Sequence, residues 1–314
     1  MSQTRFQKTA FHYLQYLALK AFCVLFALLP YRFSIFISRM LMGWTTIFFP
    51  NRFKRMEYDI ARAFPDKSAQ QVHQIAKDSW RNMGTILAEF IQLTHMSREN
   101  FKKHCRVTGL EKIQQAQGTT GGIIHIGHFT NWEAFGLAAS VYGMDKAVLA
   151  LRADNPYIDQ EMNRLRNIFT GRTFYSNHQD KPFFACMRWI KKKKLLGILI
   201  DQNAGSSQVW IPFMGRIAAF SPITALLAIK MQIPVFPVQV RREKDGLLVC
   251  EIKDPLLPPT EYNAENTRRF TRQLIAFYEF CLHEDPASWL WAHNLWKREA
   301  EGERYLQAHP EERV

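Results

Sequence analysis

The first 56 residues of this 314-residue chain contain no aspartate or glutamate, and Glu57 is the first acidic residue. Eight lysines and arginines lie in that stretch, and bases and acids nearly balance in the rest of the chain. Much of the formal net charge of +13 is therefore N-terminal. The same stretch is rich in aromatic residues. Basic, acid-free and aromatic sequence favours contact with an anionic membrane surface over contact with nucleic acid.

Other familiar patterns are missing as well. The five cysteines are scattered, and no two form a Cys-x-x-Cys pair, which argues against structural zinc or a disulfide framework and for a reducing compartment. No glycine-rich phosphate loop is present, so we expect no nucleotide cofactor. No zinc finger, RNP motif or basic zipper points to nucleic acid. A hydrophobic fraction of 47% excludes a disordered chain.

The apolar runs of the N-terminal stretch are short. Residues 21–31 and 41–51 each fall below the roughly 18–20 residues that a clean spanning helix needs. Residues 14–29 form a marginal span if the side chain of Lys20 reaches the interface. We expect residues 1–56 to be a membrane anchor, either a single span or in-plane interfacial helices. The alternative is a helix pair packed in a soluble domain.

The remaining sequence, residues 57–314, alternates between helical and extended patterns and contains no linker or repeat. Ser68 and Gln71 form a potential capping box, and apolar residues then recur at helical spacing up to Ile91. Apolar strand-like segments follow, separated by helical ones. This pattern predicts an α/β fold with a central, mostly parallel sheet flanked by helices. The simplest division is one catalytic domain behind the N-terminal anchor.

The sharpest chemical feature is the segment GHFTNWE at residues 127–133. His128 follows an expected buried strand, and Glu133 lies in the first turn of the next expected helix. Sites in open α/β sheets lie beyond the carboxyl ends of strands, and imidazole suits a general base near neutral pH. A carboxylate on the other ring nitrogen would fix the tautomer. By itself a His-x4-Glu pattern is a weak signal, and a locally bonded structural histidine is the alternative.

The sequence HFTNWE has the His-x4-Asp/Glu pattern of the glycerolipid acyltransferase superfamily, and its Asn-Trp-Glu form resembles the bacterial lipid A late acyltransferases, the lauroyl/myristoyl transferase family. Other segments resemble that family in the same order along the chain: residues 61–68, 151–159, 163–172, 197–205, 210–228 and 289–297. One departure is the segment His293-Asn294-Leu295-Trp296-Lys297, where many members have His-Arg-Arg-Trp-Lys. Two basic contacts are therefore absent, which leaves the exact acceptor less certain than the chemistry.

The resemblance implies transfer of a fatty acyl chain from acyl carrier protein to a hydroxyl of a lipid A precursor. His128 would take the proton of that hydroxyl, and Glu133 would orient His128. Substrate contacts are expected from Asn131, Arg152 and Arg166, the two arginines binding phosphate or the oxyanion. Asp201, at the end of an expected strand, would order Arg166 or a water, or cap the next turn. Each arginine has an ion pair as its structural alternative.

Further features carry weaker expectations. Four consecutive lysines (Lys191, Lys192, Lys193 and Lys194) end an expected helix, where they either dock an acidic acyl carrier protein or form a solvated helix terminus. His125 and His128 should point to opposite faces of the strand, so we expect no shared metal and a buried, hydrogen-bonded His125. Three alternatives are open for Trp289, Trp291 and Trp296: they line an acyl groove, belong to an interfacial belt, or pack in the core.

We therefore expect a metal-independent acyltransferase at the bacterial inner membrane with its active site facing the cytoplasm. Its partners would be acyl carrier protein, a lipid A precursor and inner-membrane lipids, with no nucleic acid. Acylation of another glycolipid or aminolipid is the first alternative. A non-catalytic module that binds anionic lipid is the second.

Overall fold

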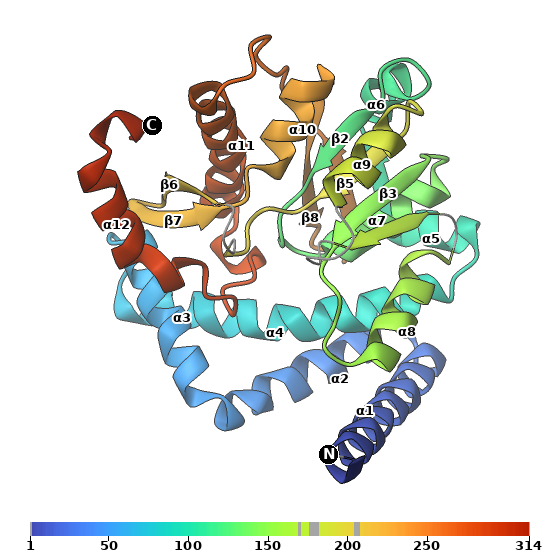
Figure 1. The fold of residues 1–314 in the computed structure, drawn as a ribbon. Coiled ribbons are helices and arrows are strands. Elements are labelled where there is room, and N and C mark those ends of the chain that lie inside the picture. Colours follow the sequence, from blue (N-terminus) through green and yellow to red (C-terminus); the bar gives the residue numbers. More distant parts are fainter. Residues whose placement is uncertain (1, 169–170, 176–181, 204–207, 314) are drawn as a thin grey trace.

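A seven-stranded sheet forms the centre of the computed structural model, which describes residues 2–168, 171–175, 182–203 and 208–313 (Figure 1). Its strand order is β1-β9-β8-β2-β5-β3-β4, and all neighbours are parallel except β8 and β9. The mostly parallel sheet predicted from the sequence is confirmed. The strands are β1 (Cys105–Thr108), β2 (Gly122–His125), β3 (Lys146–Ala150), β4 (Arg172–Tyr175), β5 (Leu195–Ile198), β8 (Val235–Arg242) and β9 (Leu248–Ile252).

Helices cover both faces of this sheet, which explains why the central strands are uninterrupted apolar runs. Alternate residues of β2 enter different hydrophobic clusters: Ile123 packs with one set of helices and Ile124 with the other. The first set is α9 (Pro182–Ile190), α10 (Ile223–Met231) and α11 (Ala264–Glu284). The second set is α5 (Arg98–His104), α6 (Leu110–Ala116), α7 (Trp132–Val141) and α8 (Pro156–Arg166).

Helix α4 (Ala69–Thr94) begins at the predicted capping box. The Ser68 hydroxyl accepts a hydrogen bond from the Gln71 amide at 3.3 Å, and the Gln71 side chain accepts one from the Ser68 amide at 2.8 Å. Two donors that the first helical turn leaves unpaired are thereby satisfied. Its apolar face is buried, with Val72, Ala76 and Trp80 in the main core. In Figure 1 this long helix lies between the sheet and the N-terminal helices.

The N-terminal stretch folds as α1 (Ser2–Leu28), α2 (Tyr31–Trp44), the 3-10 turn η1 (Thr45–Phe48) and α3 (Pro50–Ala63). Among the described residues, only one helix is long and apolar enough to cross a membrane: α1, over Thr9–Leu28. Lys20 lies inside that segment and pairs with Glu161 of α8 at 3.2 Å. Helix α3 runs through residue 56 and buries Met56 in the main core, so the expected domain boundary falls inside a helix.

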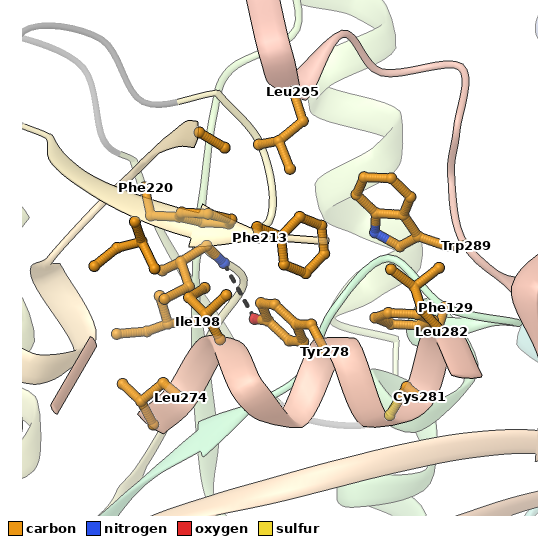
Figure 2. Packing of buried hydrophobic residues seen from close by; sticks show 14 of the residues in the cluster. Phe129, Ile198, Phe213, Phe220, Leu274, Tyr278, Cys281, Leu282, Trp289 and Leu295 are labelled. Atoms are coloured by element: carbon orange, nitrogen blue, oxygen red, sulfur yellow. Dashed lines mark hydrogen bonds between the residues drawn. The ribbon is translucent and has the colours of Figure 1, made fainter. Parts of the chain in front are cut away.

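The C-terminal part closes the fold around the ends of the central strands. An antiparallel pair, β6 (Val209–Phe213) and β7 (Arg216–Phe220), packs beside α11 and carries α12 (Glu299–Ala308) on its surface. Trp289, Trp291 and Trp296 lie in the core cluster between these elements, which confirms the packing alternative for all three. Figure 2 shows Trp289, Phe129 and Phe213 gathered above α11.

Candidate active site

His128 lies in the loop between β2 and α7, at the carboxyl edge of the sheet. The C-terminal segment holds this loop at His128 and at Thr130, which has a left-handed backbone conformation (φ 48°). The Thr130 amide donates to the Ser288 carbonyl at 2.8 Å, and the Leu290 amide donates to the His128 carbonyl at 3.0 Å. A non-glycine residue keeps such a conformation only where the surroundings enforce it. The loop is therefore fixed before any substrate binds.

The carboxylate that bonds the imidazole of His128 belongs to Asp201, which follows β5. The Asp201 carboxylate accepts hydrogen bonds from His128 Nδ1 and from the His128 amide, both at 2.7 Å. The indole of Trp289 donates a third at 2.9 Å. Asp201 is only 1% exposed. Burial alone would raise the pKa of Asp201, but the charge of His128 and these donors outweigh burial and lower the pKa.

These contacts select one tautomer of His128. An ionised carboxylate only accepts hydrogen bonds, so the proton of the neutral imidazole lies on Nδ1. The side-chain amide of Gln202 lies 3.2 Å from Nε2 and donates to it. The lone pair of Nε2 therefore lies on the side of the ring away from Asp201, where it accepts from the Gln202 amide. This is the arrangement that a general base requires.

Glu133, which the sequence suggested as the partner of His128, bonds a different residue in the structure. Its carboxylate forms a bidentate pair with Arg166 at the end of α8: Nε lies 3.1 Å from both oxygens, and Nη2 lies 2.5 Å from Oε1. Burial lowers the pKa of Arg166, but Glu133 more than offsets it and the pKa is raised. The orienting acid comes instead from the strand adjacent to β2, because parallel strands end at one edge of the sheet.

A cavity of about 620 Å³ begins at His128 and runs between α7 and the sheet. Its walls are apolar side chains of α7, β2, β3 and β5, and its far part is lined by Met144 and Leu195, at the opposite end of the strands. Glu133 and Arg166 line it together with Lys146. Two glycines, Gly136 and Gly197, also contribute to the wall. Lys146 is level with Leu195 at the amino end of β3, whereas His128 and Gln202 follow the carboxyl ends of β2 and β5. A long, mostly apolar cavity that begins at His128 suits a ligand with a reactive head and a hydrocarbon tail.

The other predicted substrate contacts lie outside the lining of this cavity. Asn131 is fully buried: its carbonyl caps α7 through the Ala134 amide at 3.0 Å, and its amide donates to Glu89 at 2.9 Å. Asn131 therefore holds the loop in place and does not face the cavity. Arg152 follows the lining residue Leu151 and stacks on the ring of Tyr175, 4.3 Å from the ring centroid.

The four lysines at the end of α9 lie far from His128. They directly precede β5, and so lie at the amino end of a strand whose carboxyl end leads to Asp201. Lys194 pairs with Asp145 at 2.7 Å and stacks on Trp189. A carrier protein docked on the run Lys191–Lys194 would be separated from His128 by the length of the strand. The solvated helix terminus is the better interpretation.

His125 occupies the opposite face of β2, as its spacing from His128 predicts. It is completely buried, bonds the Leu274 carbonyl at 3.1 Å through Nε2 and stacks on Tyr278. Burial lowers its pKa to about 4. The Tyr278 hydroxyl also donates to the Ile126 carbonyl at 3.0 Å and accepts from the Ile200 amide at 3.5 Å. Figure 2 draws one hydrogen bond of this hydroxyl. No cluster of metal-binding side chains exists in the part of the chain that the structure describes.

Sequence reasoning missed three contributors to this site. Gln202 bonds His128 directly, Trp289 bonds Asp201, and Glu89 supports Asn131 while paired with Arg242 at 2.8 Å. The only available signal was the position of Asp201 and Gln202 directly after an apolar strand. Trp289 and Glu89 lie 161 and 39 residues from His128 in the sequence, and only the tertiary fold brings them to the loop.

The chain is similar in sequence to known proteins of one family. The sequence profile of the bacterial lipid A biosynthesis acyltransferases matches residues 4–298. A lipid A biosynthesis lauroyltransferase of Escherichia coli K12 is 25% identical over 81% of this chain and 82% of its own length. A lipid A biosynthesis acyltransferase of Haemophilus influenzae is 23% identical, covering 90% of this chain and 87% of that protein. The crystal structure of the 1-acyl-sn-glycerophosphate acyltransferase PlsC from Thermotoga maritima aligns with a TM-score of 0.40 and 12% identity, over 83% of this chain and 99% of PlsC. The profile match spans nearly the whole chain, and this protein therefore belongs to the bacterial lipid A biosynthesis acyltransferase family.

Proposed function

We propose that this protein transfers a fatty acyl chain from acyl carrier protein to a hydroxyl of a lipid A precursor. The observation that carries the proposal is the position of His128, held by Asp201 at one end of a long apolar cavity. Family membership supports the acyltransferase class and lipid A as the acceptor class. The donor, the acceptor hydroxyl and the residue roles are our inferences.

In the proposed reaction the acceptor hydroxyl displaces the Gln202 amide from Nε2 of His128. Nε2 takes the hydroxyl proton while the oxygen attacks the thioester carbonyl carbon, giving a tetrahedral oxyanion. Collapse of that intermediate breaks the carbon–sulfur bond, and the departing thiolate takes the proton back from His128. The ester forms, the carrier thiol is released, and the enzyme is unchanged.

Neighbouring groups would lower the barrier at two points. The buried Asp201 carboxylate stabilises the imidazolium that forms during attack. The Gln202 amide, once displaced, lies within reach of the oxyanion and can donate to it. Arg166 places a positive charge in the cavity wall, and its bidentate pair with Glu133 holds the guanidinium in one orientation. Glu133 thus acts through Arg166, as a positioning residue.

The dimensions of the cavity fit a fatty acyl tail. The wall from Leu195 to Ile200 spans roughly 17 Å at the rise of a β-strand. An extended alkyl chain advances about 1.3 Å per carbon, given C–C bonds of about 1.5 Å. The wall therefore matches a chain of roughly a dozen carbons, with its carbonyl beside His128 and its methyl end near Met144.

The direct test is the mass of lipid A from cells with and without this gene. An acyltransferase of this class adds one acyl mass, and the purified protein should reproduce that addition from acyl carrier protein and a lipid A precursor. A His128→Ala variant should not. Unchanged lipid A mass, together with acylation of another lipid in a total extract, would contradict the proposed acceptor. Full transfer by folded His128→Ala protein would contradict the proposed base.

A further inference from the structure

Helix α2 carries an apolar face that none of the described elements covers. Phe33, Phe36, Met40 and Trp44 follow one another at helical spacing, and the stripe continues at Ile47 of η1. All five side chains are exposed, Trp44 by 61% and Ile47 by 77%. Large apolar side chains gathered on one exposed stripe mark an interaction surface. We call these five residues the α2 stripe.

The opposite face of α2 is fixed to the protein. Ser34 and Ser38 are buried, and the Ser38 hydroxyl donates to the Gly84 carbonyl of α4 at 2.8 Å. The two helices approach so closely that a Cβ at Gly84 would lie 2.5 Å from the Ser38 carbonyl oxygen. Helix α2 therefore lies flat along α4 with its stripe directed outward. In Figure 1, α1 and α2 lie on the side of α4 away from the sheet, whereas α3 rises past the start of α4 toward α12.

The chain then bends by 100° between the segments Tyr31–Phe48 and Pro50–Ala63, which leaves Phe48 exposed at the corner. Helix α3 cannot enter a bilayer, because Met56 and Ile60 are fully buried in the main core. Its Asp59 pairs with the buried Arg216 at 2.7 Å. The bent pair is thus neither a second span nor a re-entrant loop. The α2 stripe can only meet a surface that lies alongside the protein.

The charges around the α2 stripe indicate which surface that is. Arg32 precedes the stripe, and Arg52 and Lys54 follow its corner, with no acidic residue before Glu57. Exposed apolar side chains of α1, among them Val24, Leu25 and Leu28, lead into α2 without a polar break. We propose that the α2 stripe lies in the plane of an anionic membrane surface, beside the exposed apolar side chains of α1. Apolar and aromatic side chains flanked by bases are typical of in-plane helices at such a surface.

This contact would also orient the site. Helix α1 packs on α8 through Tyr13 and Tyr157 and through Asn155, whose amide donates to the His12 carbonyl at 2.8 Å. The segment that precedes α8 includes Leu151, an exposed residue of the cavity wall. Two membrane contacts, α1 and the α2 stripe, fix the tilt of the molecule as one contact cannot. The proposal does not depend on the acyl-transfer reaction.

A fluorescent label tests this contact in the full-length protein. All five native cysteines are buried, so an introduced cysteine is labelled selectively. Ile47→Cys places an environment-sensitive nitrobenzoxadiazole dye on the α2 stripe, and Leu257→Cys provides a matched exposed control far from α2. On vesicles containing phosphatidylglycerol, the dye at position 47 should shift to the blue and be quenched by shallow nitroxide-labelled lipids. The dye at position 257 should do neither.

Three results would overturn the proposal. The first is no blue shift at position 47 on vesicles that the protein itself binds. The second is quenching of the dye at position 47 by aqueous iodide as strongly as at position 257. A blue shift without vesicles, together with a dimer in sedimentation, would show that a second copy covers the α2 stripe. The double variant Phe36→Glu, Trp44→Glu should lose transfer to acceptor in vesicles by ~10-fold and keep it in detergent micelles. If the double variant loses transfer in vesicles and in micelles alike, its fold is disrupted, and the dye measurements decide the proposal. If the wild-type protein shows no transfer, only the proposed function is contradicted.

Discussion

Replacing Asp201 by asparagine tests the reaction chemistry most directly. The side chain keeps its size, but one carboxylate oxygen becomes an NH₂ group. The carboxylate accepts three hydrogen bonds, from the His128 amide, His128 Nδ1 and Trp289 Nε1. An amide cannot accept all three, and if its NH₂ group faces Nδ1 the proton of His128 moves to Nε2. The base then lacks its lone pair on the substrate side.

The expected loss in kcat is roughly 10³- to 10⁴-fold, or about 4–5.5 kcal/mol, as when the aspartate of a catalytic triad becomes asparagine. The variant also loses hydrogen bonds to a buried charge, each worth about 1.5–3 kcal/mol. Because the folded-state pKa of Asp201 is lowered, this stability is present above the unfolded pKa and is lost as pH falls through the folded one. The variant should therefore have a lower melting temperature than the wild type at neutral pH.

Single-turnover transfer from acyl carrier protein measures the rate, and circular dichroism with thermal melting confirms that the variant is folded at the assay temperature. Trp289→Phe is a matched control: it removes one hydrogen bond to Asp201 and keeps the charge, so kcat should fall by less than about 10-fold. Asp254→Asn, on the surface, should leave kcat unchanged. Near-wild-type kcat in folded Asp201→Asn protein would refute the role of Asp201, and would return Glu133 to the position that the sequence suggested.

Three further predictions concern the cavity and the core. A Cβ at Gly136 meets no atom within 4 Å, so a leucine side chain there would fill part of the cavity, and Gly136→Leu should shift donor preference toward shorter acyl chains in a competition between carrier-bound donors. Gly136→Ala should keep the wild-type preference and stabilise α7 by up to about 1 kcal/mol. Unchanged preference in the leucine variant would place the acyl tail elsewhere. Arg166→Lys retains the charge but not the bidentate pair with Glu133, and should lower kcat by roughly 10- to 100-fold. Glu133→Gln should lower kcat less than Asp201→Asn does in the same assay. A wild-type rate in both Arg166→Lys and Glu133→Gln would exclude Arg166 from the reaction. The pKa of buried His125 is lowered to about 4, so between pH 7 and pH 4 the unfolded state binds a proton at His125 more readily than the folded state does, and the free energy of unfolding should fall by up to about 3 kcal/mol. Urea titrations should show a smaller loss for His125→Gln. An equal loss in that variant would assign the pH dependence to other groups.

The fold was largely predictable because its signals are local. Capping by Ser68 and Gln71, the periodicity of α4 and the apolar runs of β2 and β5 all depend on residues close in sequence. The arrangement of the N-terminal stretch was harder. Whether α2 crosses a membrane or lies along it depends on its packing against α4, where Ser38 bonds Gly84, 46 residues further along the chain.

The site divides in the same way. The sequence by itself determined that His128 lies at the carboxyl end of a buried strand, that His125 faces the other side, and that the N-terminal stretch suits an anionic surface. Only the tertiary structure decided that Asp201 holds His128 while Glu133 pairs with Arg166, and that the side chain of Asn131 holds the loop in place through Glu89. The physical reason is that the periodicity of a strand depends only on residues adjacent in the sequence. The partner of a buried charge is chosen by which strand lies alongside, and in a parallel sheet that strand is distant in sequence.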